Sequence, residues 1–167
     1  MSGLQILEIT SDQLSEYKNF FTTGLLSDEE NFRITPADEL NAPFPTRDKA
    51  DSFTLGAYID HVLAGVVSFE RDGRNREKLR HKGLLFRMYV SKEFRGMGIA
   101  KKLIENLISR IENIEDIEQI NLTVLANNAN AKMLYERVGF TTFSSEPNAI
   151  KWKGNSFTED QMALSLR

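Results

Sequence analysis

The chain has 167 residues, which suits one domain with one sizeable hydrophobic core. Its formal net charge of −3 lacks the basic excess that nonspecific nucleic-acid binding usually needs. The absence of cysteine excludes a catalytic thiol, disulfides and cysteine-ligated zinc, and it agrees with a reducing compartment. No apolar stretch reaches membrane-spanning length, and the first residues lack a signal-peptide pattern. We therefore expect a cytoplasmic protein that binds neither nucleic acid nor a membrane.

Hydrophobic periodicity predicts a mixed α/β chain without repeats or an interdomain linker. The expected order is strand, helix, loop, two strands, a third strand, helix, strand, helix, strand and a final strand pair. These elements cover residues 4–10, 11–26, 27–49, 52–59, 62–70, 84–90, 98–111, 119–125, 128–139, 140–145 and 148–166. Such an order predicts a mixed sheet with helices on both faces.

Several residues mark the ends of these elements. Ser11 is the expected N-cap of the first helix, and Gly139 is the expected C-cap of the last one. Asp60 and His61 form the expected turn of a strand pair. The loop at residues 27–49 holds three of the four prolines, and we expect only one or two short helical turns there.

A basic connection at residues 71–82 separates the strand pair from the next strand. It carries six lysines and arginines in twelve residues. Such a run attracts anions, or it is simply a solvated hairpin loop, and the sequence leaves both readings open. The two histidines give no zinc-binding pattern, so no metal is expected.

A glycine-rich turn stands between the strand at 84–90 and the long helix that follows. Gly96 and Gly98 lack side chains that would keep a phosphate from the backbone, and a helix N-terminus offers unpaired N–H groups. The same residues also suit a plain strand-to-helix turn flanked by solvated basic residues. The spacing fails for a Walker A loop and for a Rossmann fingerprint, since the residue three after Gly98 is Lys101. A generic nucleotide-phosphate binder remains one alternative.

Two motifs stand out in this half of the chain. The first, R-x-x-G-x-A, is formed by Arg95, Gly98 and Ala100. The second, N-x-x-A-x-x-L-Y-E-x-x-G-F, is formed by Asn128, Ala131, Leu134, Tyr135, Glu136, Gly139 and Phe140. Both resemble motifs of the GCN5-related N-acetyltransferase (GNAT) superfamily, in which the first is the pyrophosphate loop. The resemblance implies a single acetyltransferase-like domain over residues 1–167, with a strongly twisted, mostly antiparallel sheet of about six or seven strands.

The resemblance also implies acetyl coenzyme A as the acyl donor. Backbone N–H groups of the loop would hold the pyrophosphate, Arg95 would add charge, and Asn128 would hydrogen-bond the pantetheine arm. The strand backbone near Met88, Tyr89 and Val90 would pair with that arm and polarise the thioester carbonyl. The loop residues expected to bind the donor are Arg95, Gly96, Met97, Gly98, Ile99, Ala100 and Lys101.

Tyr135 would be the general acid that protonates the departing thiolate, although an aromatic residue on an apolar helix face is also a normal core residue. Many relatives carry a glutamate base on the strand at 84–90, but Leu84 stands at that position here. Other carboxylates that could serve as a base are more typical of solvated surface groups. They are Glu70, Glu146, Glu159 and Asp160.

Arg87 interrupts the apolar strand at 84–90, where a charge is costly unless it is paired or wet. It either lines the acceptor cleft, as a partner for a carboxylate of the acceptor, or forms an ion pair with a neighbouring strand. Arg87 and Glu70 are therefore the candidate acceptor-binding residues.

Together these features predict an N-acetyltransferase that transfers an acetyl group to a primary amine of a small molecule or a protein. The transfer would proceed by direct attack in a ternary complex. The alternative on the same fold is a non-catalytic CoA-binding module, which the missing strand glutamate favours and Tyr135 opposes. The C-terminal tail resembles a bacterial subset of the superfamily. Relatives in the superfamily are often dimers, so a homodimer is compatible with the resemblance.

Overall fold

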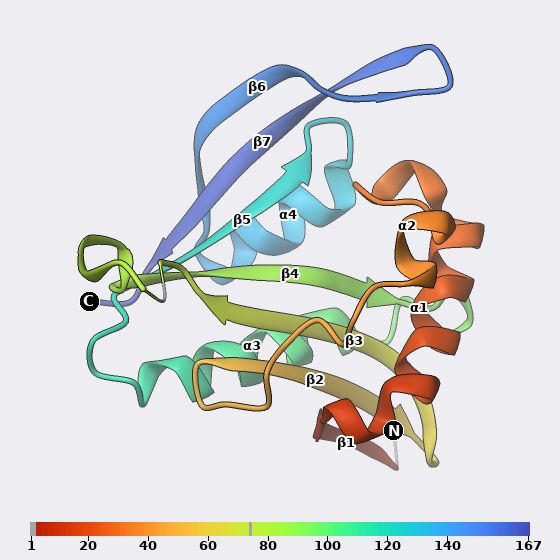
Figure 1. Cartoon of the computed structure of the whole chain (residues 1–167), viewed down its shortest axis with the longest axis horizontal. Coiled ribbons are helices and arrows are strands. Elements are labelled where there is room, and N and C mark those ends of the chain that lie inside the picture. Colours follow the sequence, from red (N-terminus) through yellow and green to blue (C-terminus); the bar gives the residue numbers. More distant parts are fainter. Residues whose placement is uncertain (1–2, 74) are drawn as a thin grey trace. The chain divides into compact units, whose positions relative to one another are not determined.

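The computed structural model describes residues 3–73 and 75–167 and has one seven-stranded, mostly antiparallel sheet with helices. Its strand order is β1-β2-β3-β4-β5-β7-β6 (Figure 1). The strands are β1 Leu4–Ile9, β2 Ser52–Ile59, β3 Val62–Arg71, β4 Lys82–Val90, β5 Gln119–Leu125, β6 Thr141–Trp152 and β7 Asn155–Ser165. The α-helices are α1 Leu14–Ser27, α2 Pro36–Leu40, α3 Ile99–Glu112 and α4 Ala129–Val138. The fold class is the one that the sequence predicts, and so is the element order except near the end, where residues 141–152 form one strand and not two.

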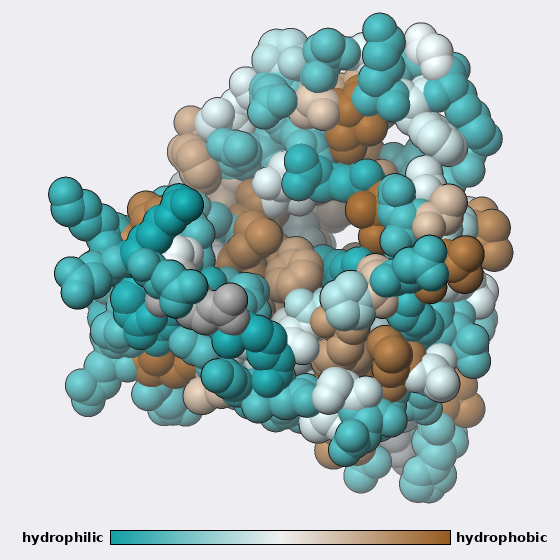
Figure 2. Space-filling view, viewed as in Figure 1, coloured by the Kyte–Doolittle hydropathy of each residue, from teal (hydrophilic) through white to brown (hydrophobic). Residues whose placement is uncertain are grey.

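The chain divides into two compact units. The first unit comprises Met1–Glu70 and Leu85–Ile114, and the second comprises Arg71–Leu84 and Glu115–Arg167. A single domain over residues 1–167 stays a prediction. No helix among residues 3–73 and 75–167 is both long and apolar enough to cross a membrane. Hydrophilic side chains dominate the face that Figure 2 shows, and the apolar residues form separate patches.

Helices α1 and α3 cover opposite faces of β3 in the first unit. Val66 belongs to the core cluster that contains Tyr17 and Phe21 of α1. A Cβ on the preceding residue, Gly65, would lie 3.1 Å from Leu103 of α3. Since successive residues of a strand point to opposite faces, the two helices bury the two faces of β3.

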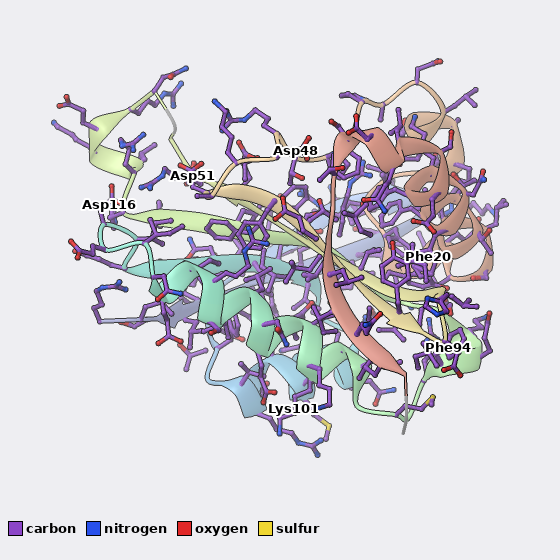
Figure 3. All side chains as sticks on the ribbon, turned by 90° about the horizontal axis from the view of Figure 1, so that it is seen from below. Phe20, Asp48, Asp51, Phe94, Lys101 and Asp116 are labelled. Atoms are coloured by element: carbon purple, nitrogen blue, oxygen red, sulfur yellow. The ribbon has the colours of Figure 1, made fainter. Side chains whose placement is uncertain are left out.

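The packing of α1 against β4 is close enough to require a glycine. A Cβ at Gly24 would lie 2.6 Å from the Tyr89 ring. Tyr89 also contacts Phe20 and Phe32, with ring centroids 5.6 and 5.5 Å apart (Figure 3 labels Phe20). The last turn of α1 therefore packs tightly against the C-terminal half of β4.

The cap of the first helix differs from the prediction. The N-cap is Thr10, which forms a capping box with Gln13. Ser11 is the first residue of the short 3₁₀ turn that leads into α1. Ser11 is instead held by Asp48, whose carboxylate accepts from its hydroxyl at 2.6 Å. The predicted turn at Asp60 and His61 is confirmed, with φ of 48° and 70°.

In the second unit, β7 lies between β5 and β6 and is antiparallel to both. Helix α4 packs on β7, where a Cβ at its C-cap Gly139 would lie 3.0 Å from Leu164. Gly139 has a φ of 119°, so the predicted glycine C-cap is confirmed. Tyr135 of α4 stacks edge-on against Phe140 just beyond that cap, with ring centroids 5.7 Å apart.

Candidate functional site

The glycine-rich turn presents its backbone to solvent at the start of α3. Gly96 and Gly98 both lie in the left-handed region, with φ of 80° and 76°, and a Cβ on either would meet nothing within 4 Å. In the described part of the chain, the N–H groups of residues 96–101 donate no hydrogen bond to a backbone carbonyl. Six unpaired donors at a helix N-terminus make a site that suits an anion such as a pyrophosphate.

The basic side chains of this turn already have carboxylate partners. Arg95 donates from Nη2 to Asp28 at 2.8 Å, and Lys92 lies 3.7 Å from the same carboxylate. Lys101 lies 3.7 Å from Glu105 and is exposed (Figure 3). Each of these cations faces a carboxylate that offsets much of its positive charge. The attraction for an anion therefore comes mainly from the backbone N–H groups and the helix dipole.

Asp28 is a neighbour of the turn that the sequence did not reveal. It closes α1, so it places a negative charge at a helix C-terminus, where the dipole disfavours it. Burial also works against its charged form. The hydrogen bond from Arg95 and the positive charges of Arg95 and Lys92 outweigh burial and lower the pKa of Asp28. Asp28 thus fastens the end of α1 to the start of the glycine-rich turn.

The strand that precedes the turn carries the other predicted donor-binding residues. Tyr89 is buried, while Met88 and Val90 are half-buried. Val90 accepts a hydrogen bond from Nε of Arg95 at 3.0 Å, and the Arg95 guanidinium lies 5.6 Å from the centre of the Tyr89 ring. Hence the end of β4 and the glycine-rich turn are joined through the Arg95 side chain.

Neither candidate acceptor residue is a solvated, unpaired charge. Glu70 accepts from Nε and Nη2 of Arg47 at 3.2 and 3.1 Å and from the Ser52 hydroxyl. Arg87 pairs with Glu39 of α2, so its partner comes from a helix and not from a neighbouring strand. Their role toward an acceptor stays a prediction.

Asn128 and Tyr135 belong to the second unit. Asn128 caps α4, because its Oδ1 accepts from the N–H of Ala131 at 3.3 Å, and its amide NH₂ carries the donors. Tyr135 is 6% exposed, and burial raises the pKa of its phenol above the ordinary value. The phenol is therefore protonated at neutral pH, as a proton donor must be.

Two carboxylates expected to be solvated are buried instead. Glu159 is 4% exposed and Asp160 is 5% exposed. Asp160 accepts from Lys132 of α4 at 2.6 Å, which neutralises its charge, and from the Ser145 hydroxyl of β6. Glu146, the partner of Glu159 in the β6–β7 pair, is exposed. The strand pattern alone could not reveal this burial, because it does not show which helix and which strand lie next to β7.

The basic connection is only partly solvated. Arg71 is 5% exposed and donates to Asp116 at 3.1 and 3.0 Å and to the carbonyl of Arg80 at 2.6 Å, so the solvated reading is wrong for this residue. Arg76 and Lys78 are exposed, and Arg74 lies outside the described residues. A role for this segment in recruiting anions stays a prediction. Residues 3–73 and 75–167 contain no cluster of three or more side chains that could hold a metal ion.

The Lys132–Asp160 pair makes stability depend on pH. Hydrogen bonds from Lys132 and Ser145 lower the pKa of Asp160, and burial opposes them less strongly. Because the folded-state pKa is depressed, this contribution is present above the ordinary aspartate value of about 4 and is lost as pH falls through the folded-state pKa. Asp160→Asn should lower the free energy of unfolding by about 1–3 kcal/mol at pH 7, and the loss should shrink in acid.

Urea unfolding at neutral and acidic pH measures this difference. Glu146→Gln is the matched control, since Glu146 is an exposed carboxylate on the neighbouring strand, and it should change stability little. An Asp160→Asn loss that is equal at both pH values would contradict the ion-pair origin.

Comparisons with known proteins agree with this geometry. The acetyltransferase (GNAT) family model matches residues 9–140. The Spermine/spermidine N(1)-acetyltransferase of Bacillus subtilis (strain 168) is 32% identical over 92 residues, and a relative from Bacillus subtilis subsp. natto (strain BEST195) is 34% identical over the same length. The match covers 52% of this chain and 57% of either curated relative, so the chain spans little more than half of their length.

Solved structures share the fold over nearly the whole chain. A GNAT-family acetyltransferase of Streptococcus pneumoniae superposes with a TM-score of 0.79 at 23% identity, covering 97% of this chain and 98% of its own. A Salmonella typhimurium protein solved with its cofactor acetyl-CoA has a TM-score of 0.81 at 18% identity, covering 99% and 95%. Since the family model spans most of the chain and both motifs lie on the expected elements, the chain belongs to the acetyltransferase (GNAT) family.

Proposed function

We propose that this chain is an acetyl-CoA-dependent N-acetyltransferase that modifies a primary amine. The observation that carries the proposal is the glycine-rich turn, whose left-handed Gly96 and Gly98 leave a row of unpaired N–H groups open at the start of α3. These groups would hold the pyrophosphate of the donor. The backbone of Met88, Tyr89 and Val90 would then receive the pantetheine arm and the thioester.

The reaction is a direct acyl transfer in a ternary complex. The neutral amine attacks the thioester carbonyl carbon, a C–N bond forms, and the C–S bond breaks. The nitrogen loses a proton to water or to a carboxylate, and the departing sulfur takes a proton from Tyr135. Leu84 occupies the strand position where many relatives have a glutamate, so a base on that strand has no part in the proposal.

The names of the curated relatives suggest where to look for the acceptor. Polyamines are the first class to test, followed by lysine-containing peptides, peptide N-termini and free amino acids. The experiment is a free-thiol assay of CoA release with acetyl-CoA and each amine, with mass analysis of the product. Release of CoA without an acetylated amine would contradict the proposal. Calorimetric binding of acetyl-CoA without transfer to any amine would favour the non-catalytic CoA-binding module, and binding of ATP would favour a generic phosphate site.

The pyrophosphate assignment predicts the effect of Gly98→Val. A β-branched residue would strain the left-handed backbone and place methyl groups where the phosphates approach. Affinity for acetyl-CoA should fall by about 10-fold or more, as measured by calorimetry. Gly154→Val is the matched control, because Gly154 has a φ of 79° in the β6–β7 turn and its Cβ would also meet nothing within 4 Å. Equal losses in the two variants would place the effect in the fold and not in the site.

The proton-donor assignment predicts the effect of Tyr135→Phe. This change keeps the ring against Phe140 and removes only the hydroxyl, so stability and acetyl-CoA affinity should change little. The kcat should fall by roughly 100-fold where chemistry limits the rate. Tyr58→Phe removes another buried tyrosine hydroxyl, one that donates to Glu16, and should leave kcat nearly unchanged. A Tyr135→Phe enzyme with nearly full kcat would make Tyr135 a core residue only.

A further inference from the structure

Arg87 has a backbone conformation that is unusual inside a strand. Its φ of 53° lies in the left-handed region, although it is neither glycine nor asparagine and stands within β4. That conformation costs about 1–2 kcal/mol for an ordinary residue, and such strain persists only where the surroundings impose it. It reverses the regular strand geometry one residue before Met88, so it sets the direction of the following backbone.

Glu39 of α2 meets the Arg87 side chain at this point of β4. Its Oε2 accepts from Nη1 at 3.1 Å, and its Oε1 lies 2.9 Å from Nη2. Glu39 is 1% exposed, so the pair is largely screened from water. The guanidinium also lies 4.7 Å from the centre of the Phe21 ring. A planar guanidinium held on two nitrogens and one face has little freedom left.

The position of Glu39 is fixed by the short helix α2, which is held at its N-terminus and to α1. Thr35 and Asp38 form a capping box at the start of α2, with the Asp38 carboxylate accepting from the Thr35 N–H at 2.9 Å. Lys18 of α1 donates to the carbonyl of Glu39 at 2.7 Å. Helix α2 is therefore tied to α1, beside which it lies in Figure 1.

The surroundings of the pair are polar as well as buried. The Tyr17 hydroxyl lies close to Arg87 and Ser68 but makes no hydrogen bond of normal geometry, and burial raises the pKa of Tyr17 to about 12. Ser68 continues into a buried row with Thr54 and Thr46, each step 2.8 Å long. A buried ion pair beside an unsatisfied hydroxyl is a poor way to gain stability, since apolar residues of similar volume often do better. The arrangement therefore points to a role in geometry.

We propose that Glu39 is a positioning residue: through Arg87 it holds the left-handed kink of β4 and so orients the backbone of Met88, Tyr89 and Val90 toward the thioester. The inference rests on the proposed function for its catalytic consequence. Backbone groups that stabilise an oxyanion must be preorganised, because a misplacement of about 1 Å can cost on the order of 100-fold in rate. Because Glu39 is buried, it acts in this proposal only through Arg87 and has no part in the pyrophosphate turn.

The test is Glu39→Gln, which keeps the shape and removes the charge. The kcat should fall by about 10-fold or more, while the Kd of acetyl-CoA should stay within about threefold, because phosphate binding is left intact. NMR should also show changed backbone amide shifts at Arg87 and Met88. Glu30→Gln is the matched control, since it makes the same chemical change at an exposed residue between α1 and α2 and should leave kcat and these shifts in place.

A double-mutant cycle separates positioning from direct action. In an Arg87→Met background, Glu39→Gln should lower kcat no further, because Glu39 acts only through that guanidinium. An additive loss would overturn the proposal, and so would unchanged kcat in Glu39→Gln or equal losses in Glu39→Gln and Glu30→Gln. If the wild type transfers no acetyl group, the proposed function fails by itself. The amide shifts then still decide whether Glu39 holds the kink, and unchanged shifts would overturn it.

Discussion

The buried pair between Glu39 and Arg87 is the constraint around which the polar interior of the first unit is arranged. A left-handed arginine within a strand is stable only if its side chain is held, and a buried guanidinium is tolerable only if a carboxylate meets it. Helix α2 supplies that carboxylate. A helix of five residues is marginal by itself, so its capping box and the hydrogen bond from Lys18 help to keep it folded. Local helix signals, a buried charge and a strand kink are thus one interdependent system.

The glycine-rich turn differs from this pair in that most of its positive charge is already matched by carboxylates. Its cations are paired with Asp28 and Glu105, so the turn offers an anion mostly oriented N–H groups. This arrangement favours a polyphosphate that fits the backbone over any anion that happens to be near, because dipoles act within about one helical turn. It also means that Arg95 can bind a phosphate only if its guanidinium contacts the phosphate and Asp28 together or breaks its bond to Asp28. The link from Asp28 through Arg95 to Val90 joins the end of α1 to the end of β4.

The sequence predicted what depends on local pattern and missed what depends on long-range pairing. The two turn glycines and the Gly139 cap follow from turn and helix chemistry, so the motifs lie where the periodicity placed them. Arg87 was recognised as a costly charge in a strand, but its partner was expected on a strand, since nothing in the letters shows that α2 buries Glu39. For the same reason, Asp160 was read as a surface group while Lys132, its partner, lies 28 residues earlier. The unusual φ of Arg87 has no sequence signal, because an arginine has no preference for it.

The burial of Tyr135 also limits what the phenol does in the proposed reaction. A free tyrosine has a pKa of about 10 and a cysteine thiol one of about 8.5, so full proton transfer from phenol to a thiolate of that kind is already uphill by about 2 kcal/mol. Burial raises the phenol pKa further and steepens that slope. The hydroxyl therefore first hydrogen-bonds the sulfur as negative charge develops during C–S cleavage, and it gives its proton to the sulfur only late in that step. A buried donor serves that purpose well, since a hydrogen bond to a developing charge is strongest where water is excluded.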